Sequence, residues 1–148
     1  MSKELSPSAR KVEDVLNNLG FDCTVMELSD STRTAMDAAD AVGCEVGQIV
    51  KSLIFKGKKS HIPILVVASG ANRVNMKKIK GIVSEPVQMA DADFVRKETG
   101  FAIGGVPPLG HSERLKAFID EDLFEYTTKL GKYHIDMLYY LEYGWENN

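Results

Sequence analysis

The spacing of apolar residues predicts a helix near the start of the chain. Between Val12 and Leu19, apolar residues recur every three or four positions, as they do on one face of a helix. Pro7 suits the first position of a helix, and Gly20 suits the position just beyond its end. We therefore expect a helix that begins after Ser6 and ends before Gly20.

Three shorter helices are predicted from signals at their ends. Thr34, with Asp37 three residues later, resembles a capping box. Asn75 and Asp91 are residues that commonly cap the start of a helix. The predicted spans, each with the glycine that ends it, are Thr34 to Val42 with Gly43, Asn75 to Lys80 with Gly81, and Asp91 to Thr99 with Gly100.

The middle of the chain reads as a β-hairpin. Two apolar segments, Gln48 to Lys56 and Ile62 to Ser69, flank a turn that contains Gly57. Shorter strands are expected at Cys23 to Leu28, Phe101 to Ile103, Lys116 to Ile119, Phe124 to Thr128 and His134 to Leu138, with Gly131 at the turn between the last two. Strands and helices interleave without strict alternation, so we expect an α+β fold with a mixed, mostly antiparallel sheet.

Composition indicates one globular domain over residues 1–148. Hydrophobic residues make up 44% of the chain and charged residues 26%, which is the balance of an ordinary globular protein. The N-terminus lacks the apolar core of a signal peptide, and no apolar run has the length of a transmembrane helix. Because two cysteines do not make a disulfide framework, we expect a reduced, cytoplasmic protein.

The charge is unevenly distributed. The formal net charge is −3, yet the window from residue 51 to 80 has eight basic residues and no Asp or Glu. These basic residues are Lys51, Lys56, Lys58, Lys59, Arg73, Lys77, Lys78 and Lys80. A local positive field of this kind suits a polyanionic partner. The alternative is a set of solvated surface lysines.

Lys51 interrupts a strand that otherwise looks buried. If the strand alternates, Lys51 shares a face with Leu53 and Phe55, the expected core side. A lysine at such a position costs free energy unless an anionic group meets it. The alternative is an edge-strand lysine whose ammonium reaches solvent.

The segment from Gly104 to His111 has three glycines and two prolines in eight residues. It cannot be a helix and would make a poor strand. Such a loop can turn backbone N–H groups toward a ligand and stabilise an oxyanion. The alternative is a rigid structural turn.

Other residue types with catalytic potential lack supporting motifs. Cys23 and Cys44 have no partner motif for a cysteine hydrolase, so buried thiols are expected. His61, His111 and His134 are too far apart to resemble a known metal-binding spacing. The sequence therefore predicts no metal site and no cofactor.

Four segments together resemble the YbaK-type editing domains, which also occur inserted in bacterial prolyl-tRNA synthetases. The segments run from Thr34 to Gly43, from Gln48 to Phe55, from Pro63 to Gly70 and from Thr99 to Gly110, and the last includes a Gly-x-x-x-Pro from Gly104 to Pro108. The resemblance covers about residues 5 to 140. It implies the fold of that family, with a barrel-like sheet flanked by short helices.

The resemblance also implies hydrolysis of the ester in mischarged aminoacyl-tRNA. Lys51 falls on the family's characteristic lysine, and the loop that lines its pocket includes Gly104 and Gly105; these three are the expected catalytic residues. The implied substrate-binding residues are Thr34, Ser52, Gly70, Val106, Pro107, Pro108, Gly110, His111 and His134. The tRNA-binding residues would be Lys56, Lys58, Lys59, Arg73, Lys77, Lys78 and Lys80, because the substrate is a tRNA acceptor end.

The amino acid removed is expected to be small, such as Cys, Ala, Ser or Thr, on tRNA-Pro or a similar tRNA. The resemblance implies a trans-acting enzyme with an aminoacyl-tRNA synthetase as a second partner, and neither membrane nor metal. The alternative is a module without catalytic activity that binds tRNA or a small ligand while docked on a synthetase.

Overall fold

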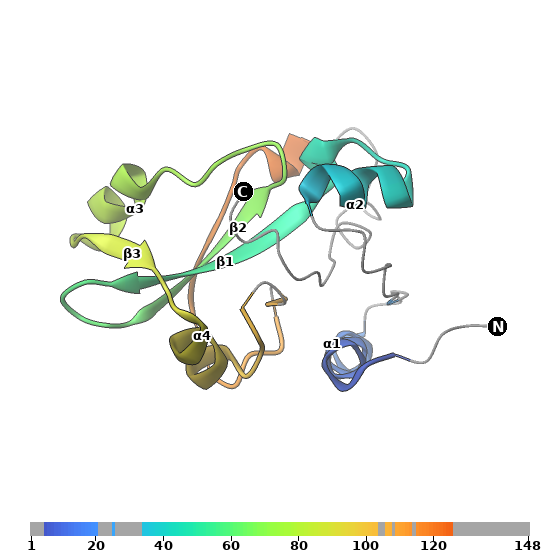
Figure 1. Ribbon diagram of the computed structural model, residues 1–148, viewed down its shortest axis with the longest axis horizontal. Helices are drawn as coiled ribbons and strands as arrows, with labels where there is room; N and C mark the ends of the chain where they lie inside the picture. Colours follow the sequence, from blue (N-terminus) through green and yellow to red (C-terminus); the bar gives the residue numbers. More distant parts are fainter. Residues whose placement is uncertain are drawn as a thin grey trace.

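The computed structural model describes residues 5–20, 25, 34–103, 106–107, 109–113 and 115–125. At its centre is a four-stranded sheet in the order β3-β1-β2-β4 (Figure 1). The strands are β1 (Val50–Gly57), β2 (Pro63–Ser69), β3 (Val87–Met89) and β4 (Lys116–Ile119). β1 pairs antiparallel with β2 and β3, whereas β4 lies parallel to β2.

The helices begin where short polar side chains satisfy their first backbone N–H groups. They are α1 (Pro7–Asn18), α2 (Ala35–Val42), α3 (Met76–Val83) and α4 (Ala92–Thr99), with a 3-10 turn, η1, at Val46–Gln48. Ser6, Thr34, Asn75 and Asp91 each accept such a bond. Thr34 and Asp37 form the expected reciprocal capping box.

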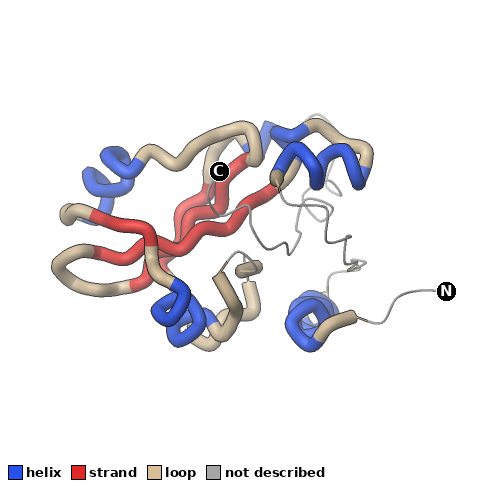
Figure 2. The backbone as a smooth tube through the Cα atoms, in the orientation of Figure 1, coloured by secondary structure: helices blue, strands red, loops and turns tan. Residues whose placement is uncertain are grey.

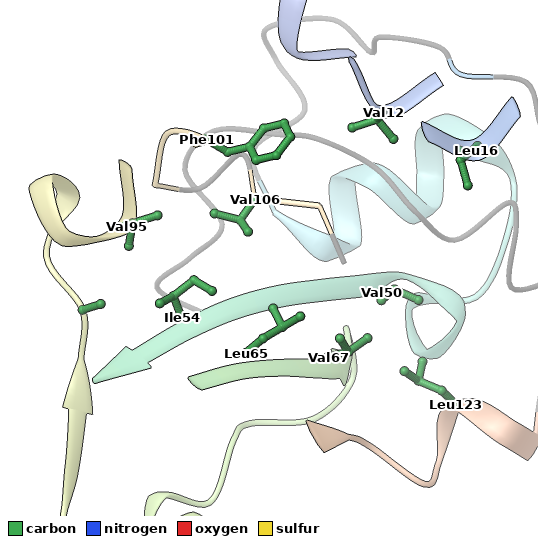
Figure 3. Close-up of a cluster of buried hydrophobic side chains, with 11 residues drawn as sticks. Val12, Leu16, Val50, Ile54, Leu65, Val67, Val95, Phe101, Val106 and Leu123 are labelled. Carbon is green, nitrogen blue, oxygen red and sulfur yellow. The ribbon is translucent and has the colours of Figure 1, made fainter. Parts of the chain in front are cut away.

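Helices cover both faces of the sheet (Figures 1 and 2). On β1, Val50 and Ile54 point to the side of α1 and α4, where they join Phe101 and Val106 in one core cluster (Figure 3). The opposite face of the sheet packs against Ile79 of α3. α2 packs its buried alanines against Ile49, just before β1. The alternation along β1 therefore separates two cores.

The α+β class and the mixed sheet are confirmed, and so are the central hairpin and strand Lys116–Ile119. The sheet is open within the described ranges, with β3 and β4 at its edges, so the barrel-like closure is not found there. Strand β3 was not predicted, because three residues carry too little pattern.

Several predicted boundaries were wrong. α3 continues through Gly81 to Val83, and it ends where Ser84 adopts a left-handed conformation with φ of 64°. Gln48 lies in η1, not in the strand. The predicted strand Phe101–Ile103 is absent, and the predicted strand at Phe124 begins instead with a helical turn over residues 123–125.

The remaining strand predictions fall on parts of the chain that are not described. The segment Cys23–Leu28 lies outside the described residues, apart from Val25. The segment His134–Leu138 and the turn at Gly131 also lie outside them. These predictions are therefore untested.

Candidate functional site

The candidate site lies at the end of the sheet where β1 begins and β2 ends. In the antiparallel register Val50 faces Ser69 and Lys51 faces Ala68. A hollow of about 400 Å³ opens at this end. Its lining residues are Thr34, Ala35, Met36, Val46, Lys51, Gly70, Ala71, Asn72 and Arg73.

Lys51 is the most unusual residue of this hollow. It is only 1% exposed, so the alternative of a lysine that reaches solvent is wrong. Within the described part of the chain, its ammonium has no hydrogen-bond or ion-pair partner. Burial lowers the pKa of Lys51 most, the nearby Arg73 charge lowers it further, and the carboxylate of Asp120 raises it. The site therefore holds a desolvated cation next to an exposed one.

Thr34 and Gly70 shape the walls of the hollow. Thr34 caps α2 through a 3.0 Å bond that its hydroxyl oxygen accepts from the backbone N–H of Asp37, a bond that does not use the hydroxyl proton. Gly70 makes a close backbone approach, since its N–H donates to the carbonyl of Ile49 at 2.6 Å. A Cβ on Gly70 would lie 2.7 Å from the carbonyl oxygen of Val46. Glycine is thus required at this position for steric reasons.

Sequence reasoning missed two polar residues beside this hollow, Asn72 and Asp120. The Asn72 side-chain amide donates to Asp120 Oδ2 at 2.8 Å and to Asp122 Oδ2 at 2.7 Å. Asp120 directly follows β4, and because β4 runs parallel to β2, its carboxylate reaches the end of β2. The sequence offered one signal for Asp120, a polar residue directly after a predicted strand. Only the strand order shows that this residue lies at the end of β2.

The described part of the glycine-proline loop lies over the other face of the sheet. Val106 belongs to the core cluster of α1 and α4 (Figure 3). Val106 and Ser52 both line a small cavity. Because side chains alternate along a strand, Ser52 lies on the face of β1 opposite Lys51. Pro107 is buried. Gly104, Gly105, Pro108 and His134 lie outside the described residues.

The side chain of His111 forms a hydrogen bond within this loop. Its Nε2 lies 2.6 Å from the carbonyl oxygen of Pro107, and since a carbonyl can only accept, Nε2 donates. The ring packs edge-on against Phe101, and the Lys11 ammonium lies 4.6 Å from the centre of the Phe101 ring. Burial lowers the pKa of His111, the bond to Pro107 opposes this, and the Lys11 charge lowers it further. His111 and Gly110 line a second hollow, separate from that of Lys51.

The predicted tRNA-binding residues do not all share one surface. Lys77, Lys78 and Lys80 are exposed on α3, on the same side of the sheet as Lys51. Lys78 and Arg73 both line a larger hollow of about 470 Å³ between α3 and β4. Lys56 points to the opposite side, where its ammonium lies 4.8 Å from the ring centre of Phe94 on α4.

Lys58 and Lys59 lie in the exposed hairpin turn. Their turn is anchored by Glu85, whose Oε1 accepts the backbone N–H groups of Lys59 and Ser60. Backbone hydrogen bonds and the hydroxyl of Ser60 lower the pKa of Glu85. Both lysines are thus held in an exposed turn next to β3.

No group of three or more His, Cys, Asp or Glu side chains in the described ranges is arranged to hold a metal ion. None of the helices in those ranges combines the length and apolarity that a bilayer crossing requires.

Comparison with known proteins identifies relatives across most of this fold. The uncharacterized protein YwhH of Bacillus subtilis strain 168 is 32% identical over 104 residues, which cover 70% of this chain and 66% of that protein. The proline–tRNA ligase of Thermosipho melanesiensis is 35% identical over 83 residues, 55% of this chain and 14% of that protein. The chain thus spans just under two thirds of the first relative and about one seventh of the second.

A solved structure and a family model also match this chain. The crystal structure of a candidate trans-editing enzyme for prolyl tRNA synthetase is 52% identical, with a TM-score of 0.77 over 83% of this chain and 78% of that one. The model of the aminoacyl-tRNA editing domain matches residues 29–131. This range includes the Lys51 hollow, the loop and the basic helix α3. The chain belongs to the aminoacyl-tRNA editing domain family.

Proposed function

We propose that this protein is a trans-acting deacylase that hydrolyses the ester of mischarged aminoacyl-tRNA. The observation that carries the proposal is Lys51, a lysine that is buried in the wall of an open hollow without a partner in the described part of the chain. A buried unpaired cation destabilises the fold, so its retention is best explained by an anionic ligand. The aminoacyl end of a tRNA supplies both phosphates and the charge that develops during ester hydrolysis.

The reaction needs few protein groups because an aminoacyl ester is already activated. Water attacks the carbonyl carbon, the bond to the ribose oxygen breaks, and the products are the free amino acid and the intact tRNA. In this proposal Lys51 contacts the terminal nucleotide or the developing oxyanion. The backbone N–H donors expected at Gly104 and Gly105 stay a prediction, because the described residue next to them, Val106, lies on the face of the sheet opposite Lys51. The neighbouring ribose hydroxyl assists. Positioning and electrostatic stabilisation would supply most of the rate enhancement.

The proposed substrate is a small amino acid on tRNA-Pro or a similar tRNA. The similarity to a proline–tRNA ligase and to a candidate editing enzyme for prolyl tRNA synthetase supports this tRNA. It also supports a synthetase as a partner. The hollow of about 400 Å³ at Lys51 must hold part of the nucleotide as well as the amino acid, which favours a small side chain.

A deacylation panel tests the proposal. We expect at least one of Cys-, Ala-, Ser- and Thr-tRNA-Pro to be hydrolysed well above its spontaneous rate, while correctly charged Pro-tRNA-Pro is spared. The measurement is loss of labelled amino acid from tRNA, with a protein-free reaction as the blank. If the tRNAs bind but none is hydrolysed, the protein is a binding module and not an enzyme.

The α3 lysines should carry much of the salt dependence of tRNA binding. Replacing Lys77, Lys78 and Lys80 by Gln removes three charges from one exposed helix. Each lost phosphate contact should reduce the slope of log K against log[salt] by roughly 0.7–0.9, so the triple variant should lose about 2–3 in slope. Fluorescence anisotropy with labelled tRNA between 50 and 300 mM KCl would measure it.

The matched control for this experiment is on α4. Arg96 and Lys97 are exposed basic residues on the opposite side of the sheet, and their replacement by Gln should leave the slope nearly unchanged. Equal losses of slope per charge removed in both variants would mean that tRNA binding does not prefer the α3 side, and the proposed tRNA-binding surface would be wrong.

A further inference from the structure

Hydrogen bonds through both its backbone and its carboxylate hold Asp120 in place at the end of β4. Its backbone N–H donates to the carbonyl of Val67 at 2.8 Å. Its Oδ2 accepts from the backbone N–H of Ser69 at 3.1 Å and from the Asn72 side chain at 2.8 Å. Its Oδ1 accepts from the backbone of Asp122 at 3.0 Å. A carboxylate with this many donors is fixed in both position and charge.

Two of the groups that Asp120 binds, the Ser69 N–H and the Asn72 amide, belong to the turn that forms one wall of the Lys51 hollow. Gly70, Asn72 and Arg73 from this turn all line the hollow. A further hydrogen bond holds the start of the turn, since the Ser69 hydroxyl donates to the carbonyl of Gly47 at 2.8 Å. Without Asp120, the Ser69 end of the turn would keep its bond to Gly47, but Asn72 would lose its half-buried acceptor.

Asp120 also balances the charges at this site. Of the charged groups in the described part of the chain, Arg73 disfavours the protonated form of Lys51 and Asp120 favours it. Burial raises the pKa of Asp120, but the hydrogen bonds from Asn72, Asp122 and Ser69, together with the Lys78 charge, lower it overall. The carboxylate is therefore ionised at neutral pH.

We propose that Asp120 is a positioning residue of the Lys51 site, where its carboxylate anchors the turn from residue 69 to 73 and supplies a negative charge near Lys51 and Arg73. The inference rests on the proposed function for its catalytic consequence. Its structural consequence, the protonation of Lys51, can be measured without any activity. The two parts can therefore fail separately.

The test compares Asp120→Asn with Asp122→Asn. Both variants remove one carboxylate that accepts a bond from Asn72, and both keep a side-chain oxygen able to accept it. Of these two aspartates, only Asp120 acts on the protonation of Lys51. The direct readout is the NMR titration of Lys51 in protein with ¹³C-labelled lysine, assigned by comparison with Lys51→Met.

We expect Asp120→Asn to move the titration of Lys51 to lower pH, because the charged form loses its only favourable neighbour among the described groups. The alkaline limb of the kcat profile should move to lower pH in parallel. At pH 7.5 we expect kcat to fall about 10- to 100-fold, the usual effect of misplacing a catalytic group, with a smaller change in KM. Asp122→Asn should match the wild type in both titration and kcat.

A Lys51 titration that is the same in Asp120→Asn and in the wild type would overturn the inference. If the titration moves but neither protein has deacylase activity, the role of Asp120 stands and the proposed function fails. Asn72→Ala provides the second variant, since it keeps the Asp120 carboxylate and removes the two hydrogen bonds that the Asn72 amide donates to Asp120 and Asp122. It should speed amide hydrogen exchange at Ser69 and lower kcat without moving the Lys51 titration; unchanged exchange and kcat would contradict the anchoring role.

Discussion

Replacing Lys51 by Met should abolish deacylation and make the protein more stable. Met has a similar length and no charge, so it fits the space without the cost of desolvating an ammonium. The free energy of unfolding should rise by about 1–3 kcal/mol, the usual cost of a buried polar group without a partner. We expect kcat to fall roughly 100- to 1000-fold, as when one group that stabilises an oxyanion is removed. Urea unfolding and the deacylation assay on the same sample measure both effects.

The stability gain of Lys51→Met should depend on pH. The pKa of Lys51 in the folded protein lies below its ordinary value of 10.5, so between these two values the unfolded chain binds more protons than the folded one. The stability of the wild type therefore rises with pH across this interval. The gain should be largest at neutral pH and should shrink as the pH approaches 10.5. A variant that keeps full activity, or that is less stable than the wild type at pH 7, would refute the assignment of Lys51.

Gly70→Ala should cost about 1–3 kcal/mol of stability, the range for overpacking a tight site. The added Cβ would lie 2.7 Å from the carbonyl oxygen of Val46 and 2.9 Å from the Cβ of Ala35. Neither neighbour is the end of a flexible side chain, so α2 and η1 must move away from β2. Because both elements line the Lys51 hollow, we expect deacylation to fall as well. Thermal unfolding followed by circular dichroism measures the loss of stability.

Gly81→Ala is the matched control. Gly81 lies inside α3, and a Cβ there would meet nothing within 4 Å. Alanine should therefore stabilise the helix by about 0.5–1 kcal/mol, because it loses less conformational entropy on folding. If both variants lose stability equally, the close approach at Gly70 is not the cause.

Local signals predicted the elements whose interactions are local. Ser6 and Thr34 cap their helices through bonds to residues three positions away, and Gly100 ends α4 in a left-handed conformation with φ of 81°. The hairpin also joins neighbouring segments, so its pattern sufficed. The same alternation singled out Lys51 as a lysine on an apolar face. Physical rules that act within a few residues can be read from one sequence.

Predictions failed where packing outweighed a weak local preference. Gly81 is a poor helix residue, but the helix continues because Val83 packs into the core below α3. Phe101 lies in an apolar triplet that resembles a strand. Its backbone N–H instead bonds to the Thr99 hydroxyl at 3.0 Å, and its ring fills the core between the loop and α1. Tertiary contacts routinely override propensities of this size.

The sequence by itself determined the α+β class, the helix caps, the hairpin and the basic window. It also placed Lys51 on the apolar face of a strand. Only the tertiary structure decided that Lys51 and the described part of the glycine-proline loop lie on opposite faces of the sheet, and that Asp120 reaches Asn72. The last two residues are 48 positions apart. Their contact depends on β4 pairing parallel to β2, two strands that are far apart in the sequence. No pattern within a single segment encodes that pairing.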